Sequence, residues 1–560
     1  MTLYFDKTVH ILNPRTVELG ENVLHDSEYI ESFSASSSIL EDVRKNCVFD
    51  ESSVYIQEIL QNLTNDRNLL FSRQRFFLNV DNIYVYALLQ KVEPLIESAK
   101  WFLTVKDDEI QDLLKTVFFK WKFFRQFNCF EFPLHLKQLY SIYLSPAIGV
   151  LSPVIYFAMP LIIMRMKYGI KIPIKYYTQT LYTLSTASIS QSESSLLRNM
   201  TILSYGSSVF FYGQGCYNAL STSKSTNDIC KLLVKHTKNV IELFRISNTL
   251  ADLLSENTYY HLQSIKYQEP QHLTGSYLKH FLHLDTEKKS HIFHALNIVH
   301  VADALQAIHK FINHNKMCRP SFDFNHDIPR YRFVNMWHVS LDPRSAVKNS
   351  IFNTNKKRNC IITGPNAAGK STFIKSALVN VLLAQSITFC AAENISLTPF
   401  DYIGSQICIP DCKGKESLFE AEMYRSKANL DYVKCHQNSK CILFMDEIFN
   451  STNPVEGISG SHSVIKNIGE CKNVAVFLTT HFDYICNLNK NAYSLYKFDC
   501  TIGDKHIVYN YKIKDGISKQ FIALDILRLN GFDRNVVEDA QRIKDLILQS
   551  SSLSSLPHQV

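Results

Sequence analysis

Apolar residues recur at helical intervals through much of the first half of the chain. The spacing predicts long helices over Asn227 to Leu254 and over Ile292 to Phe311. It also predicts a helical segment from Asn68 to Leu114. We therefore expect a mainly α-helical region over residues 71–325, whose helices carry no chemistry of their own but can transmit motion. Residues 1–70 are mixed and polar, and their pattern assigns them no function.

The pattern then changes to short apolar runs that are separated by turn residues. Asn359–Thr363, Cys441–Met445 and Val474–Leu478 have the length and composition of parallel strands that are buried on both faces. Ser371 to Ala384, after the first of these runs, reads as a helix. The sequence therefore predicts an α/β domain over residues 326–515.

The last segment of the chain reads as two short helices and a tail. Ser518 to Leu529 and Asn535 to Leu548 flank the turn residues Asn530 to Asp533, which predicts a helix-turn-helix over residues 516–548. Residues 549–560 are polar and Ser-rich, and we expect them to be disordered. The predicted fold class is thus multidomain, with a mainly α-helical N-terminal region, an α/β domain and a C-terminal helix-turn-helix.

One uncharged stretch, Ile142 to Met164, is long enough to cross a bilayer. It contains Pro146, Pro153 and Pro160, and each proline removes a backbone donor and so frees a carbonyl that lipid cannot satisfy. We therefore expect a buried core element. A membrane span is the alternative, because the cationic residues between Arg165 and Lys175 follow directly, as positive flanks would.

Composition places the chain among ordinary globular proteins. At 560 residues it is too long for one core, and 46% hydrophobic with 20% charged residues excludes a wholly disordered protein. The net charge of +7 is a mild excess that suits an anionic partner such as nucleic acid without requiring one.

Cysteine usage and the opening residues indicate an intracellular protein. The nearest cysteine pairs, Cys408–Cys412 and Cys435–Cys441, lack a second ligand pair at zinc-site spacing, so we expect reduced thiols rather than a metal cluster or a disulfide framework. Asp6 and Lys7 interrupt the first residues, which argues against a secretory signal. The expected compartment is the nucleus, the cytoplasm or a virus replication compartment.

The strongest chemical signal is the stretch from Gly364 to Ser371, which fits the phosphate-loop pattern Gly-x4-Gly-Lys-Ser/Thr. Gly364 and Gly369 let the backbone curl so that successive N–H groups face one anion. Lys370 adds a point charge for the terminal phosphates, and Ser371 offers a hydroxyl to Mg2+. An ordinary turn is the alternative, and the predicted flanking strand and helix disfavour it.

A phosphate loop alone binds nucleotide, whereas hydrolysis needs a carboxylate as well. Asp446 and Glu447 follow the strand Cys441–Met445, where Asp446 can hold Mg2+ through water and Glu447 can polarise the attacking water. A helix N-cap is the alternative for this pair. His481 ends the next predicted strand, beside the phosphate loop, where it can sense the terminal phosphate; a structural histidine is the alternative there.

Several motifs, in this order and spacing, resemble the ATPase of the MutS family of DNA mismatch-repair proteins. They are Gly364–Thr372, Ser417–Met423, Phe444–Ile448 and Thr480–His481, with Trp337–His338 and Val347–Asn349 upstream and Thr452 and Glu456–Gly457 downstream. The resemblance is strong over roughly residues 330–545. It is weaker before that, where Arg73–Gln74 and the two long helices are similar to the family's core and lever region.

The resemblance implies a P-loop NTPase that hydrolyses ATP to ADP and phosphate with Mg2+, and that clamps duplex, mismatched or branched DNA. It implies a homodimer, or a heterodimer with another MutS-like chain, joined through the helix-turn-helix. The implied nucleotide-binding residues are Gly364, Pro365, Asn366, Ala367, Ala368, Gly369, Lys370, Ser371, Thr372 and, toward the opposite subunit, Ser417. The implied catalytic residues are Glu447, His481 and Lys370, and the implied metal ligands are Ser371 and Asp446. Phe419 and Met423 would pack the segment around Ser417, and Glu422 would hydrogen-bond within it.

The sequence departs from the family pattern at three places. Ala367–Ala368 replace a Met-Gly pair, and Phe449–Pro454 replaces a Gly-Arg-Gly-Thr-Ser run that contacts the other subunit. The chain also lacks room for the full mismatch-reading domain, whose Phe-x-Glu wedge stacks on a mispaired base. Phe49–Glu51 has those letters, and we interpret this match as coincidence.

Two other function classes are weighed against this one. An ABC or SMC-type ATPase would place a Ser-Gly-Gly signature shortly before the acidic strand, whereas Ser459–Ser461 comes after it. A membrane-attached scaffold with a regulatory nucleotide site would use Ile142 to Met164 as its anchor, and this reading is not favoured.

Overall fold

The computed structural model describes residues 15–33, 37–79, 82–105, 115–190, 195–256, 263–271, 273–286, 289–407, 417–488, 492–503, 506–518, 520 and 522–553. The chain divides into two compact units that are not continuous in sequence. Unit 1 is drawn from residues 1–89, 250–263 and 298–560, and unit 2 from residues 90–249 and 264–297. The predicted boundaries at residues 70 and 325 do not coincide with these divisions.

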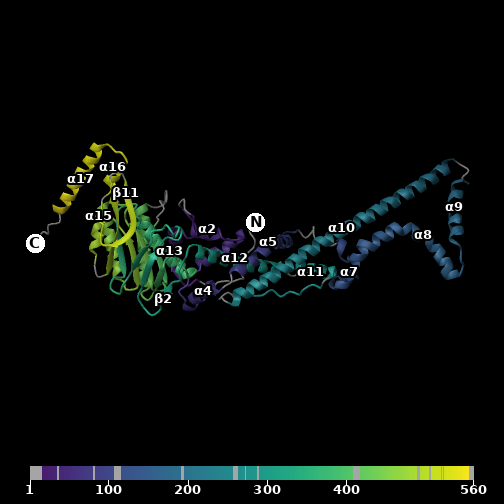
Figure 1. Ribbon diagram of the computed structural model, residues 1–560, viewed down its shortest axis with the longest axis horizontal. Helices are drawn as coiled ribbons and strands as arrows, with labels where there is room; N and C mark the ends of the chain where they lie inside the picture. Colours follow the sequence, from purple (N-terminus) through teal and green to yellow (C-terminus); the bar gives the residue numbers. More distant parts are fainter. Residues whose placement is uncertain are drawn as a thin grey trace. The chain divides into compact units, whose positions relative to one another are not determined.

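A seven-stranded sheet forms the centre of unit 1, in the order β1-β7-β8-β9-β5-β10-β11 (Figure 1). Its neighbouring strands run parallel, except for the antiparallel pair β10 and β11. The strands are β1 (Glu18–Leu19), β5 (Asn359–Thr363), β7 (Tyr402–Gln406), β8 (Cys441–Asp446), β9 (Val474–Thr479), β10 (Tyr493–Ile502) and β11 (Ile507–Asp515). Strands β5, β8 and β9 lie where the apolar runs predict them, and all but the last residue of β8 are buried.

The register of the central strands aligns their carboxyl ends. Thr479 of β9 pairs with Ile362 of β5 on one side and with Asp446 of β8 on the other. The loops that leave these three strands therefore start at the same edge of the sheet, which is where open α/β sheets bind ligands.

Helices and a second sheet cover the two faces of the seven-stranded sheet. Helices α14 (Leu418–Cys435) and α15 (Pro454–Glu470) share one apolar cluster with the central strands. Helix α13 (Lys370–Ser386) packs against β8 and β9, and nearly all of its residues are buried. The second sheet has the order β2-β6-β3-β4, and the Tyr331 ring of β3 lies 4.6 Å from the Phe477 ring of β9. Its strands are β2 (Ser321–Phe322), β3 (Tyr331–Met336), β4 (Asn349–Phe352) and β6 (Asn394–Leu397).

Short helices from the start of the chain pack into unit 1. They are α1 (Val23–Asp26), α2 (Ile39–Arg44), η1 (Asp50–Ser52), α3 (Ser53–Gln61) and α4 (Arg67–Asn79). The buried carboxylate of Asp303, in α12 (Lys289–His314), accepts the backbone N–H groups of Val48 and Phe49 and the hydroxyl of Ser52. The Phe49 ring is only 7% exposed, so in this fold it is a core residue rather than a wedge for a base.

Unit 2 is helical. Its elements are the later part of α5 (Asn82–Thr104), η2 (Arg125–Cys129), α7 (Glu131–Leu139), the π-helical turn η3 (Tyr140–Leu144), α8 (Ser145–Tyr168), α9 (Ile174–Ser190), most of α10 (Ser195–Glu256), α11 (Thr274–Thr286) and the start of α12. A small aromatic core, in which the Trp101 ring stacks on His236 at 4.4 Å and Phe102 lies 5.3 Å from Phe281, joins α5, α10 and α11.

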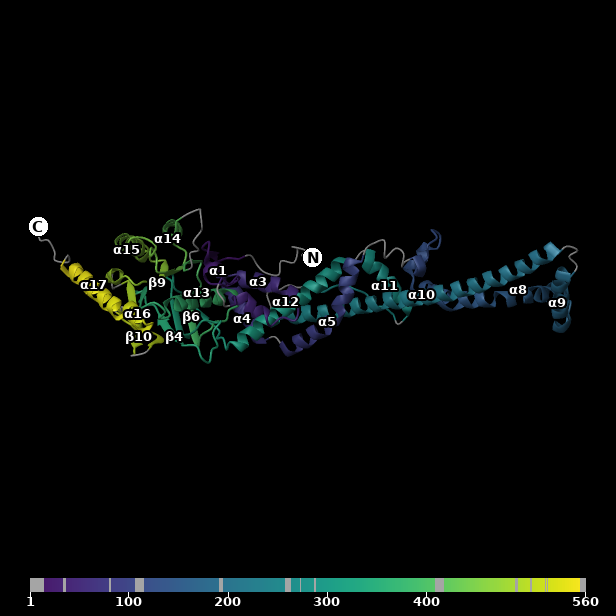
Figure 2. The ribbon, with the colours of Figure 1, turned by 90° about the horizontal axis from the view of Figure 1, so that it is seen from above.

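The expectation of a buried core element at Ile142 to Met164 is wrong. Helix α8 passes through Pro153 and Pro160 as one helix, and most of its side chains are exposed. Composition alone could not give this result, because an uncharged run is equally suited to a protein core and to another apolar environment. Helices α8 and α10 run in opposite chain directions in unit 2, and the Ser223 hydroxyl of α10 donates to the carbonyl oxygen of Ile142 just before α8 (Figure 2).

The described part of the chain ends in two helices, α16 (Ala523–Leu529) and α17 (Arg534–Leu553), joined by a turn with Gly531 at φ +79°. Helix α17 extends beyond the predicted end at Leu548, into the stretch expected to be disordered. The remaining residues of that predicted tail lie outside the described part of the chain.

Candidate nucleotide site

The loop between β5 and α13 has the backbone geometry that its sequence predicts. Gly369 precedes α13 with φ +98°, and a Cβ atom on Gly364 would lie 2.9 Å from the carbonyl oxygen of Phe498. Both positions therefore require glycine. Ala367 also has a positive φ, +62°, which is strained for a residue with a Cβ atom. The loop keeps its curled backbone even where alanine replaces the family's residues.

Lys370, the first residue of α13, points back into this loop. Its Nζ atom donates to the carbonyl oxygens of Gly364, at 2.8 Å, and Pro365, at 3.3 Å. The same atom forms an ion pair with Oε1 of Glu447 at 3.1 Å, and the Lys370 side chain is only 4% exposed. A buried ammonium group is thus held at the point where the loop meets the end of β8.

Asp446 ends β8; its carboxylate accepts a hydrogen bond from the hydroxyl of Thr479 and lies near the hydroxyl of Ser371. Burial raises the pKa of Asp446, and these two hydroxyls and Lys370 act in the opposite direction. A carboxylate and a serine hydroxyl that meet at one point are oxygen donors of the type that Mg2+ prefers. The residues present therefore fit the predicted metal site.

Glu447 has the strongest electrostatic perturbation of the site. The neighbouring His481 side chain and the ammonium group of Lys370 outweigh burial and lower the pKa of Glu447 to about 2. The Nδ1 atom of His481 lies 3.6 Å from Oε2 of Glu447, and 41% of the His481 side chain is exposed. Glu447 also has φ +47°, and its backbone N–H donates to the carbonyl oxygen of Thr479 at 3.1 Å. Sheet contacts thus hold an ionised carboxylate in a strained conformation.

Ser417 lies at the start of α14, where it makes a capping box with Glu420. Its hydroxyl accepts from the backbone N–H of Glu420 at 3.2 Å, and the Glu420 carboxylate accepts from the backbone N–H of Ser417 at 2.9 Å. Ser417 is exposed, and within the described part of the chain its hydroxyl forms hydrogen bonds with Glu420. The structure does not bring it to the residues around Lys370.

The helix that starts after Ser417 contacts the loop after the carboxylates. The buried Glu422 accepts a hydrogen bond from Ser451 at 3.1 Å, and burial raises its pKa. The Phe419 ring lies 5.6 Å from the Phe449 ring, whereas Met423 is partly exposed. The loop Phe449–Pro454, which departs from the family pattern, therefore packs on α14 of its own chain.

Comparison with known proteins finds similarity over the second half of the chain. The family described as MutS domain V matches residues 360–548. The DNA mismatch repair protein MutS of Streptococcus pyogenes serotype M1 is 25% identical over 273 residues, which are 47% of this chain and 31% of that protein. The second half of this chain is thus similar to MutS proteins. The MutS of Thermotoga maritima is 26% identical over 205 residues, 36% of this chain and 25% of its own length. The chain thus spans about a third or less of the length of these relatives.

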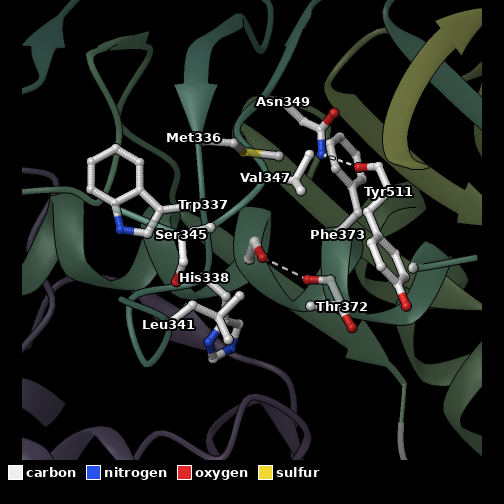
Figure 3. Close-up of a pocket in the computed structure, with 13 residues that line it drawn as sticks. Met336, Trp337, His338, Leu341, Ser345, Val347, Asn349, Thr372, Phe373 and Tyr511 are labelled. Atoms are coloured by element: carbon white, nitrogen blue, oxygen red, sulfur yellow. Dashed lines mark hydrogen bonds between the residues drawn. The ribbon is translucent and has the colours of Figure 1, made fainter. Parts of the chain in front are cut away.

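Beside the phosphate loop of this MutS-like domain lies a cavity of about 290 Å3 (Figure 3). Phe373 and Tyr511 lie on one side of it, and Trp337 and His338 lie on the other. Burial lowers the pKa of His338 to about 4, so its ring is neutral at physiological pH. Aromatic walls next to Gly369 suit a planar, mostly apolar group such as a nucleotide base. Sequence analysis singled out Trp337–His338 only as a point of family resemblance and predicted no cavity there.

Sequence reasoning missed the residues that connect this site to the start of the chain. Asp26 is fully buried and accepts from the Ser405 hydroxyl at 2.8 Å, from the backbone N–H of Ile407 at 3.0 Å and from Arg425 at 3.2 Å. It thereby ties α1 to the end of β7 and to α14. A lone Asp in a mixed polar stretch has no motif, so no sequence signal could have singled it out.

Metal clusters and disulfides are not found among the described residues. No group of three or more potential ligands that could hold a metal ion occurs there, and the described cysteines, including Cys435 and Cys441, are free thiols. The pair Cys408–Cys412 lies outside the described residues.

Proposed function

We propose that this chain is a Mg2+-dependent ATPase that converts ATP and water to ADP and phosphate, and that it clamps DNA as a dimer. The observation that carries the proposal is the meeting of Lys370, Asp446 and Glu447 at the aligned ends of β5 and β8. The site combines a cation with two carboxylates, of which Asp446 has a raised pKa and Glu447 a lowered pKa. Phosphoryl transfer to water requires such charged groups beside a loop that binds phosphate.

Each side chain has a separate task in this proposal. Lys370 exchanges its ion pair with Glu447 for the terminal phosphates, and the backbone N–H groups from Gly364 to Thr372 hold the remaining phosphate oxygens. Glu447, released from Lys370, accepts a hydrogen bond from the attacking water and orients it. His481 lies beside Glu447, where it can donate to the developing charge on the transferred phosphate.

The metal site of the proposal consists of Ser371 and Asp446. A bound Mg2+ would neutralise charge on the phosphate oxygens. Thr479 supports this site, because its hydroxyl donates to the Asp446 carboxylate and fixes its orientation.

Two features of the chain support assembly as a dimer. The exposed residues Val536, Ile543 and Leu546 recur at helical intervals and so form an apolar stripe on α17, as a helix that packs on another copy needs. Ser417, exposed at the start of α14, would reach the nucleotide of the partner subunit. Whether that partner is a like or an unlike chain does not alter this arrangement.

The ATPase proposal is tested by turnover in two variants. Glu447→Ala should still bind ATP but hydrolyse it at least about 100-fold more slowly, since it removes the residue that orients water. Lys370→Ala should lose nucleotide binding itself. The exposed carboxylate variant Glu470→Ala controls for the loss of one charge and should keep normal turnover. Wild-type ATP turnover in either Glu447→Ala or Lys370→Ala would contradict the assigned role of that residue.

The DNA half of the proposal rests on the names of the relatives and on the net charge of +7. Binding to duplex, mismatched and branched DNA should be strongest at low salt and should weaken steeply as salt rises, because phosphate contacts release counterions. Fluorescence anisotropy with and without ATP measures this. No binding to any of the three DNA forms at low salt would reject the clamp.

A further inference from the structure

Unit 2 exposes apolar side chains on every side of a long helix. Val154, Ile155, Tyr156 and Phe157 are consecutive residues of α8, and their exposed fractions run from 44% for Ile155 to 76% for Tyr156. Consecutive helical residues point about 100° apart, so together these four surround the helix. A helix that is apolar all round belongs to a protein core or to a membrane, and the exposure of α8 excludes the first.

Two helices of unit 2 have uncharged stretches of membrane length. Ile142 to Met164, in η3 and α8, contains no charged residue, and neither does Asn199 to Ser223 in α10. At 1.5 Å per residue each stretch covers roughly 35 Å, against about 30 Å for the hydrocarbon core of a bilayer. The continuous helical run Glu131–Tyr168 reaches a hydropathy of 2.1 in a window of which 0% is buried.

The structure also answers the objection that prolines raise against a membrane helix, at two of the three prolines. Pro146 has no N–H group, so it frees the carbonyl oxygen of Ile142, four residues earlier. That oxygen accepts a hydrogen bond from the Ser223 hydroxyl of α10 at 2.6 Å. A neighbouring helix therefore satisfies the carbonyl without water, which is the condition under which proline is tolerated in bilayers.

The carbonyl oxygen freed by the next proline also has a hydrogen-bond donor. Pro153 frees the carbonyl oxygen of Gly149, which accepts a hydrogen bond from the Ser152 hydroxyl at 2.8 Å. One residue further along, the carbonyl oxygen of Val150 accepts from the hydroxyl of Tyr212, in α10. The hydroxyls of Ser152 and Tyr212 thus donate to the backbone of α8.

Two more features of this surface suit lipid. Exposed cations follow the apolar run of α8, where headgroup phosphates would lie at the end of the hydrocarbon core; they are Arg165, Lys167, Lys171 and Lys175. Between α8 and α9 a groove of about 630 Å3 is lined by side chains that are mainly apolar, among them Ile155, Met159, Ile163 and Leu181. Its shape and lining fit an acyl chain.

We propose that α8 inserts into a lipid bilayer, with the uncharged part of α10 packed beside it, and anchors the chain to a membrane surface. The occupant of this apolar surface is thus the hydrocarbon of lipid rather than a second protein. The inference is independent of the proposed ATPase activity, because it uses no residue of the nucleotide site.

Flotation of the full chain with vesicles tests the anchor. The chain should float with vesicles of phosphatidylcholine alone and of equimolar phosphatidylcholine and phosphatidylserine, and should stay bound through high-salt and carbonate washes. The double variant Ile155→Lys/Phe157→Lys places two charges at the middle of α8 and should lower the bound fraction at least about tenfold. Ile83→Lys, at a residue 85% exposed in unit 1, is the matched control and should float normally.

Each other outcome overturns the proposal. Binding that high salt removes would show headgroup attraction only, and flotation that the double variant does not change would place the contact elsewhere. Absence of flotation, together with self-association that the same double variant abolishes in analytical ultracentrifugation, would assign the surface to a second copy. Circular dichroism of both variants separates these results from a folding defect, which the exposure of the substituted residues makes unexpected.

Discussion

At the scale of single residues, Glu447 is the most constrained group of the candidate site. It is ion-paired to Lys370, lies beside His481 and has φ +47°. A non-glycine residue in this region costs about 1 to 3 kcal/mol, and such strain gathers where function requires an exact orientation. The hydrogen bond from its backbone N–H to Thr479 provides part of the compensating energy.

The lowered pKa of Glu447 leads to a prediction for stability against pH. Its pKa is about 2 in the folded chain, below the value of about 4.3 for an unperturbed Glu. The ionised form is therefore favoured by folding, so its contribution is fully present above about pH 4.3 and is lost as pH falls toward 2. Urea unfolding should show wild type more stable than Glu447→Gln at about pH 6, with a smaller difference at about pH 3.

The control for this experiment is Glu470→Gln, which removes one exposed carboxylate away from the site. It separates the effect of the Lys370 and His481 contacts from the general effect of net charge on acid stability. A Glu447→Gln difference that stayed constant or grew on acidification would contradict the assigned electrostatics.

At the scale of elements, α13 links the phosphate loop to the N-terminal helices. Arg73 of α4 donates to the carbonyl oxygens of Gln385, at 3.3 Å, and Ser386, at 2.6 Å, which are the last residues of α13. The final carbonyls of a helix have no partner within it, and a guanidinium group both satisfies them and complements the helix dipole. Gln74 extends the contact to the carbonyl oxygen of Pro320 at 2.9 Å.

Removal of this link should destabilise the nucleotide-binding unit. Arg73→Ala leaves buried carbonyls unsatisfied and loses charged hydrogen bonds, so we expect a loss of about 2 to 3 kcal/mol in the free energy of unfolding. Arg75→Ala, at an exposed position two residues away, should change it by less than about 0.5 kcal/mol. Thermal unfolding of the two variants compares them, and equal midpoints would show that Arg73 does not support α13.

At the scale of the whole molecule, the predictable features were the local ones. The phosphate loop, the acidic pair at the end of β8 and the strands β5, β8 and β9 could be predicted from neighbouring residues alone. A short motif defines the loop, and short apolar runs define the strands. The contacts of Asp26 with Ser405 and Arg425 join positions far apart in sequence, and no periodicity records such a pairing. The exposure of α8 was missed because composition states how apolar a helix is, not what surrounds it.

The two-residue strand β1 has a consequence for how the chain folds. Strand β7 would otherwise form an open edge of the seven-stranded sheet, and Glu18–Leu19 covers it in parallel register with Tyr402 and Ile403. Open edges recruit strands from other chains, so this cover protects the sheet from aggregation. Because the covering strand is made first and its partner much later, the protection begins only when most of the chain has been synthesised. A ribosome-bound chain would therefore be most prone to misassociate between the synthesis of β7 and the docking of its own N-terminal segment.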